Sequence, residues 1–88
     1  MTWKIEFDDA AAKELRKLDR KAQQEILRYF QERIATNEDP RRFGKPLSRD
    51  MTGLWRYRVH NYRIICQIED GRLVVLVLRV GHRKNVYE

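Results

Sequence analysis

A group of arginines stands out in the segment WRYRVHNYRIICQI, residues 55–68. Apolar and polar residues alternate on both sides of residues 60–61 (His-Asn), and both of these residue types tolerate the positive φ of a two-residue turn. A β-hairpin with this turn sets Arg58 opposite Arg63 and puts Arg56 on the same face. Directly opposed like charges destabilise a sheet by roughly a few tenths to 1 kcal/mol. The pattern therefore favours a function that needs these charges together.

Phosphate binding is the chemistry that suits this surface, and we name Arg56, Arg58 and Arg63 the hairpin arginines. A guanidinium is permanently charged and its planar fork of donors binds phosphate oxygens in pairs. The segment contains no acidic residue, and Arg83 and Lys84 add positive charge nearby in the sequence. A strand face exposed to solvent is the simpler alternative. A concentrated face of one sign more typically binds an anion, so we expect a phosphate site.

Composition is consistent with an anionic partner. The chain has 88 residues, a formal net charge of +6 and an isoelectric point near 9.8. Nucleic acid and an acidic protein both fit this charge, and solubility alone is a sufficient reason for it. The length predicts one domain, residues 1–88.

Several classes of protein are disfavoured. The single cysteine, Cys66, permits neither a disulfide framework nor a cysteine-rich zinc site, and it suits the core of a protein in a reducing compartment. A glycine-rich phosphate loop, a serine or aspartate nucleophile arrangement and a metal-ligand cluster are all missing, so we expect no cofactor. The amino terminus lacks the pattern of a secretory signal and no apolar run is long enough to span a membrane. We therefore expect a cytoplasmic protein without a membrane partner.

The amino-terminal half predicts one strand and two helices. Residues 2–7 (TWKIEF) alternate as a half-buried strand does. Amphipathic helical patterns follow in residues 10–18 and 20–35, and the short break between them predicts a helical hairpin. The candidate N-caps are Asp8 or Asp9 for the first helix and Asp19 for the second.

The carboxyl-terminal half supplies the surface that these helices cover. Residues 36–53 form a loop rich in polar residues, proline and glycine, and the arginine-bearing hairpin follows. An Asp-Gly turn at residues 70–71 then leads into the apolar segment of residues 72–80, so the last three strands form an antiparallel meander. The expected fold class is α+β: an amino-terminal strand and a helical hairpin packed on an antiparallel sheet.

Alternation assigns the two faces of this sheet. The residues expected to face the helices are Trp55, Tyr57, Val59, Tyr62, Ile64 and Cys66, which leaves the hairpin arginines on the open face. Strict alternation from Arg63 across the second turn also puts His82, rather than Arg83, on the arginine face, although Gly81 can break that alternation. Because histidine titrates near neutral pH, His82 is a second candidate for proton transfer, with a surface position as its simpler alternative.

Four segments together carry a resemblance to a known family. FGKPL, GLWRYRV, YRIICQI and the closing VGHRKNVY occur in the order and spacing of signature segments in the RelE/ParE toxin superfamily of toxin–antitoxin modules. The chain resembles the RelE branch more than the ParE branch, over nearly its whole length. The resemblance implies an mRNA endonuclease that acts in the decoding A site of the ribosome and is inhibited by a cognate antitoxin.

The resemblance also implies which residues cleave RNA: Arg56, Arg58, Arg63, Arg83 and Tyr87. The chemistry is metal-independent attack of an RNA 2′-hydroxyl on the adjacent phosphate, which needs a base, cations for the developing charge and an acid. Arginines suit the cationic task and are very weak bases at neutral pH. Other members of the family carry lysine on the hairpin, so the base in this chain is open. Tyr87 either takes part in proton transfer and stacking or anchors the tail.

Further contacts and partners follow from charge and from the resemblance. Phosphates of the ribosome are expected to contact basic residues of the loop and of the carboxyl-terminal segment, with ordinary solvation as the alternative. The implied partners are the antitoxin, the ribosome and mRNA, and operator DNA only through the antitoxin complex. The candidate RNA- and ribosome-binding residues are Arg41, Arg42, Lys45, Arg49 and Lys84.

Two other functions stay open from the sequence. One is a poison of DNA gyrase without RNA-cleaving activity, as in the ParE branch, because fold does not determine function. The other is an inactive basic module that only binds its protein partner and, with it, operator DNA. The hairpin arginines with Arg83 and Tyr87 favour the endonuclease.

Overall fold

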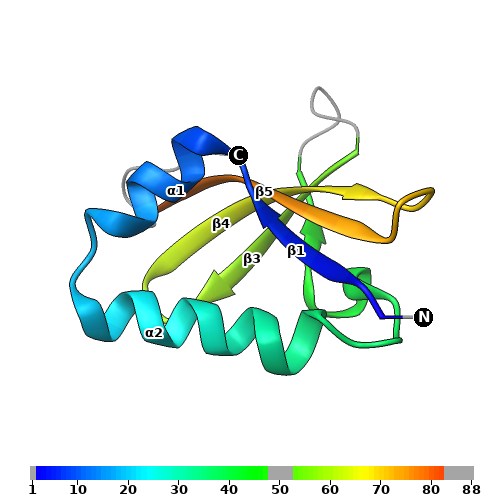
Figure 1. Cartoon of the computed structure of the whole chain (residues 1–88), viewed down its shortest axis with the longest axis horizontal. Coiled ribbons are helices and arrows are strands. Elements are labelled where there is room, and N and C mark those ends of the chain that lie inside the picture. The colour runs from blue at the N-terminus through cyan, green and yellow to red at the C-terminus, as the bar shows by residue number, and fades with distance from the viewer. Residues whose placement is uncertain (1, 48–52, 83–88) are drawn as a thin grey trace.

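Hydrophobic alternation and helical periodicity together produce a two-layer α+β fold, which confirms the predicted class (Figure 1). The computed structural model describes residues 2–47 and 53–82. In this part of the chain two helices cover one face of a five-stranded sheet with the strand order β1-β5-β4-β3-β2. The elements are β1 (Lys4–Phe7), α1 (Asp9–Arg16), α2 (Arg20–Tyr29), the π-helical turn η1 (Phe30–Ile34), the 3₁₀ turn η2 (Pro40–Phe43), β2 (Lys45–Pro46), β3 (Leu54–Val59), β4 (Tyr62–Glu69) and β5 (Val74–His82).

The two helices begin at the predicted aspartates. Asp19 caps α2, and its carboxylate accepts a hydrogen bond of 2.7 Å from the backbone N–H of Ala22. Asp8 is the N-cap of α1, although its side chain makes no capping hydrogen bond. Residues 20–34 are helical, one residue short of the predicted end, and the last turn widens into η1, where the N–H of Ala35 bonds to the carbonyl of Phe30. Neither helix has the length and hydrophobicity of a membrane span within the described residues.

The antiparallel meander of β3, β4 and β5 is confirmed. His60 takes the left-handed backbone (φ 53°) of a two-residue turn, so Val59 pairs with Tyr62 as predicted. The second turn is longer than the expected Asp-Gly pair, because it extends from residue 70 to residue 73 and Leu73 has the positive φ of 53°. Strand β5 therefore begins at Val74.

The complete sheet is mixed rather than antiparallel throughout. Strand β1 pairs in parallel with β5, with Ile5 opposite Val75. The two-residue strand β2, which the sequence analysis assigns to a loop, pairs with β3 and sets Lys45 opposite Arg56. Two parallel strands cannot be joined by a tight turn and need a long connection between them. The helices form part of the connection between β1 and its parallel partner β5.

The hydrophobic core lies between the helices and one face of the sheet. It includes the predicted inward-facing residues of the hairpin, with Trp55 and Tyr62 packed at its edge. On the opposite face a small second cluster consists of Leu47, Ile65 and Leu54. The sheet thus has one face covered by helices and one face that is partly apolar and partly available for function.

Candidate functional site

The hairpin arginines lie on the sheet face away from the helices, as predicted. Arg58 is directly opposite Arg63 in the ladder between β3 and β4. Arg56 lies opposite Ile65 in the next row and therefore points to the same face. Lys45 of β2 adds a further cation opposite Arg56. Four basic residues from three strands thus converge on this face.

The surroundings of Arg56 lower its pKa. Burial of the guanidinium lowers this pKa below the ordinary arginine value, and the nearby charges of Arg63 and Arg58 lower it further. Neither Arg58 nor Arg63 forms an ion pair with another described residue. The Nε of Arg63 is buried and has no hydrogen-bond partner among the described residues. An anion at this face would relieve the repulsion and provide acceptors for these donors.

A cavity of about 130 Å³ opens between these side chains. Its lining residues are Phe43, Lys45, Arg56 and Arg58. Beside the cavity, Gly44 follows Phe43 and lies close to the core, since a Cβ there would lie 3.1 Å from the ring of Tyr57. Cations with one aromatic ring around a small cavity form an arrangement that suits a nucleotide, with its phosphate at the cations and its base at the ring.

Phe43 was not among the predicted site residues. The available signal was an aromatic residue in the polar loop, directly before a glycine and the basic residue Lys45. The pairing of β2 with β3 brings this part of the loop to the arginine face. Within residues 2–47 and 53–82, no three carboxylate, imidazole or thiol groups lie together as a metal site requires.

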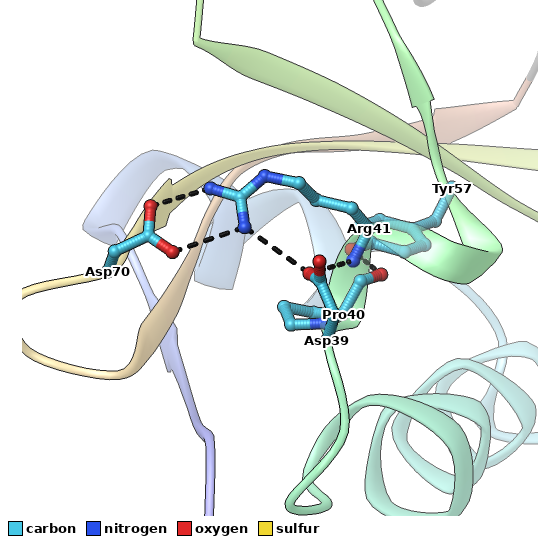
Figure 2. Close-up of polar contacts among 5 residues, drawn as sticks. All are labelled: Asp39, Pro40, Arg41, Tyr57 and Asp70. Carbon is cyan, nitrogen blue, oxygen red and sulfur yellow. Dashed lines mark hydrogen bonds and ion pairs between the residues drawn. The ribbon is translucent and has the colours of Figure 1, made fainter.

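Arg41 lies between two carboxylates of its own chain, those of Asp39 and Asp70 (Figure 2). Its guanidinium donates hydrogen bonds of 3.1 Å and 2.6 Å to the two carboxylate oxygens of Asp70 and one of 3.2 Å to Asp39. The pKa of Arg41 is raised, chiefly by the hydrogen bond to Asp70, and the same bond lowers the pKa of Asp70. This clamp joins η2 to the turn between β4 and β5. Arg41 is thus engaged within the chain rather than directed only toward a ligand.

The other expected RNA-binding residues differ in their surroundings. Arg42 forms an ion pair with Glu38 and stacks over Phe43, with its guanidinium carbon 4.6 Å from the ring centroid. Lys45 lines the cavity with the hairpin arginines. The remaining predicted site residues, Arg49, Arg83, Lys84 and Tyr87, lie outside the described residues.

The expectation that His82 shares the arginine face is wrong. Cys66 lies opposite Val77 and Ile65 opposite Arg79, so β5 has one extra residue at this point. Such a β-bulge reverses the alternation of side chains beyond it. His82 consequently lies opposite Tyr62, on the helix side of the sheet, with the two ring centroids 5.9 Å apart.

Comparison with known proteins agrees with this fold. Residues 5–87 match the family described as "ParE toxin of type II toxin-antitoxin system, parDE". The chain is 30% identical over 87 residues to the toxin RelG of Mycobacterium tuberculosis, an alignment that covers 99% of this chain and 98% of RelG.

Solved structures of similar fold are also toxins or toxin–antitoxin complexes. The toxin–antitoxin complex RelBE2 from Mycobacterium tuberculosis contains a chain with a TM-score of 0.84 and 29% identity, and the match covers 94% of this chain and 100% of that one. The isolated E. coli RelE toxin matches with a TM-score of 0.71 and 26% identity, over 91% of this chain and 83% of that one. The resemblance expected from the sequence is confirmed. The chain belongs to the ParE toxin family and is a toxin of the RelE/ParE superfamily of type II toxin–antitoxin systems.

Proposed function

We propose that this toxin is a ribosome-dependent mRNA endonuclease that cleaves the codon in the A site without a metal cofactor. The observation that carries the proposal is the direct opposition of Arg58 and Arg63, beside the cavity that Arg56 and Lys45 line. A folded domain tolerates such repulsion where the charges serve a function, and the phosphate of an RNA strand matches them in charge and geometry. The RelE and RelG toxins among the relatives support an RNA target over DNA gyrase.

The reaction uses the nucleophile of the substrate itself. The 2′-hydroxyl attacks the adjacent phosphorus, a new P–O2′ bond forms, and the bond to the 5′-oxygen of the next nucleotide breaks. The proton of the 2′-hydroxyl passes to a base and another proton is delivered to the leaving oxygen. The products are a 2′,3′-cyclic phosphate and a free 5′-hydroxyl.

The hairpin arginines would stabilise the negative charge that builds on the phosphoryl oxygens. Their guanidinium groups come from paired strands, so they are held in position before the substrate binds. The buried Nε of Arg63 is a donor available for a phosphoryl oxygen. Removal of one preorganised donor of this kind typically costs about 10²- to 10³-fold in rate.

Proton transfer is assigned to the carboxyl-terminal residues by resemblance to the family. Arg83 would contribute a further phosphate contact, and Tyr87 would orient the nucleophile or move a proton. Arg56 would act on the phosphate as a cation, because an arginine stays protonated at neutral pH. His82 does not enter the proposal, because it faces Tyr62 on the helix side.

A cognate antitoxin is the expected regulator. The RelBE2 complex of Mycobacterium tuberculosis is a toxin–antitoxin complex, and we propose the same kind of partner for this chain. The antitoxin would neutralise the hairpin arginines with an acidic or apolar segment, or displace the tail that carries Tyr87. Contact with operator DNA would occur through that complex, and the free toxin would act on ribosomes in the cytoplasm.

Primer extension on mRNA in a cell-free translation reaction tests the proposal. We expect cleavage within the A-site codon of programmed ribosomes, with products that end in a 2′,3′-cyclic phosphate. An mRNA with a 2′-deoxynucleotide at the scissile position should resist cleavage. Intact mRNA together with inhibited DNA supercoiling would overturn the proposal in favour of gyrase poisoning.

A further inference from the structure

Phe43 exposes an aromatic ring beside the hairpin arginines. Phe43 is 37% exposed, and Leu27, at 45%, is the other large hydrophobic residue of comparable exposure in the described residues. Phe43 is a member of neither apolar core cluster, so packing within the described fold does not account for it. It lines the same cavity as Lys45 and Arg58.

Two guanidinium groups lie close to this ring. The guanidinium carbon of Arg42 lies 4.6 Å from the ring centroid and that of Arg33 lies 5.5 Å from it. Arg33 also lies 5.7 Å from the ring centroid of Tyr29, so aromatic and guanidinium groups alternate along this edge. Planar aromatic and guanidinium groups are the surfaces on which unpaired nucleobases stack.

The segment that carries Phe43 is anchored to the sheet. Arg41 is bound to Asp70 and Asp39, and the buried hydroxyl of Tyr57 donates a 2.7 Å hydrogen bond to the carbonyl of Pro40 (Figure 2). These contacts tie η2 to β3 and to the turn before β5. The ring is therefore positioned before a ligand arrives, which lowers the entropy cost of binding.

We propose that Phe43, with the guanidinium groups of Arg33 and Arg42, forms a stacking subsite for one unpaired nucleobase next to the scissile phosphate. The inference rests on the proposed RNA-cleaving function and adds a binding role for Phe43 and Arg33, which were not among the expected site residues. Because every base has a π-face, this subsite strengthens binding of any sequence rather than selecting a codon. The stacked base belongs either to the mRNA or to ribosomal RNA, and the chemistry is the same for both.

Binding to ribosomes programmed with an uncleavable mRNA, which has a 2′-deoxynucleotide at the scissile position, tests the subsite. Phe43→Leu keeps an apolar side chain and removes the π-face, so we expect its affinity to fall by about 5- to 100-fold. Phe43→Trp should restore binding. Leu27→Ala is the matched control, since Leu27 is similarly exposed and lines a different cavity, with Ile5 and Phe7. Wild-type affinity of the folded Phe43→Leu variant would overturn the inference.

Abasic substitutions in the mRNA identify the source of the base. If Phe43 stacks on an mRNA base, an abasic site at that position removes the difference between wild type and Phe43→Leu. If wild type still binds more tightly than Phe43→Leu at every abasic position, the stacked base is ribosomal, and the subsite is supported. A wild-type toxin that binds programmed ribosomes without cleaving normal mRNA would overturn the proposed function alone, because the binding comparison remains valid.

Discussion

Arg41 and Arg56 carry the same guanidinium group, yet their surroundings shift the two pKa values in opposite directions. Hydrogen bonds to Asp70 raise the pKa of Arg41, whereas burial and two neighbouring arginines lower that of Arg56. The first environment stabilises the cation with carboxylates of the same chain. The second concentrates positive charge on one face of a sheet. We name the first group, Arg41, Arg42, Arg72 and Arg79, the paired arginines.

The difference separates two uses of arginine in a small basic protein. Each paired arginine connects segments or stabilises a turn, as Arg79 does by binding Glu14 of α1 at 3.1 Å. In contrast, Arg58 and Arg63 lie opposite each other, which contributes nothing favourable to the pairing of β3 with β4. The paired arginines are therefore expected to affect stability, and the hairpin arginines are expected to affect activity.

The largest effect is expected at the centre of the hairpin. Arg63→Ala should reduce single-turnover cleavage on programmed ribosomes by about 10²- to 10³-fold, because it removes a preorganised donor. Its free energy of unfolding should stay within about 1 kcal/mol of wild type, since relief of repulsion from Arg58 offsets lost packing. Arg63→Lys should recover part of the rate, because lysine keeps the charge and loses the fork. Loss of activity only in proportion to loss of folded protein would make Arg63 structural.

The next largest effect concerns the hydrogen bond from Tyr57 to Pro40, which anchors the segment that carries Arg41. Burial raises the pKa of Tyr57 far above its ordinary value, so its hydroxyl stays protonated and donates to the carbonyl of Pro40. Tyr57→Phe leaves that carbonyl without its partner and should lower the free energy of unfolding by about 1 to 2 kcal/mol. Denaturant titration measures this change, with Tyr62→Phe as a control at the edge of the core. An unchanged unfolding midpoint would contradict the anchoring role.

A smaller effect is expected for the clamp itself. Arg41→Ala should lower Tm by a few degrees and reduce cleavage only a few-fold, because exposed ion pairs contribute little. The test compares the cleavage rates of Arg41→Ala and Arg63→Ala. If folded Arg41→Ala loses as much rate as Arg63→Ala, the distinction between paired arginines and hairpin arginines is wrong.

The clamp also predicts a weak dependence of stability on pH. The hydrogen bond from Arg41 lowers the pKa of Asp70 in the folded state, so its stabilisation is present above the unfolded value of about 4 and is lost as pH falls through the folded value. The Tm difference between wild type and Asp70→Asn should therefore decrease below about pH 4. A difference that is constant across this range would show that the charge of Asp70 is irrelevant.

The smallest effect is expected at Arg72. Its guanidinium binds Glu69 at 2.7 Å and Glu6 at 3.3 Å in exposed positions. Arg72→Ala should leave cleavage unchanged and shift Tm by no more than Arg41→Ala does. A cleavage defect in this variant would mean that positive charge anywhere on the protein, rather than the hairpin arginines in particular, determines activity.

Much of the fold and part of the candidate site follow from local sequence. Hydrophobic period identifies both helices, and Asp19 marks the start of α2. The two-residue turn at residues 60–61 fixes the register of its own hairpin, because strand pairing beside a tight turn has little freedom. The opposition of Arg58 and Arg63 is therefore predictable without any tertiary information.

The rest of the site depends on contacts between distant segments. The extra residue in β5 places His82 on the helix side instead of the arginine face. Gly81 indicates that the alternation can break, but the sequence does not show that the break lies opposite Ile65 and Cys66. The pairing of β2 with β3 brought Phe43 and Lys45 to the cavity, and Asp70 engaged Arg41 across 29 positions of sequence. Local sequence determines the strand register beside a tight turn, because the few residues of the turn alone fix how the two strands pair. Long-range pairing is decided only when the whole sheet and its helices pack together, since the favourable contacts form with residues far away in the chain.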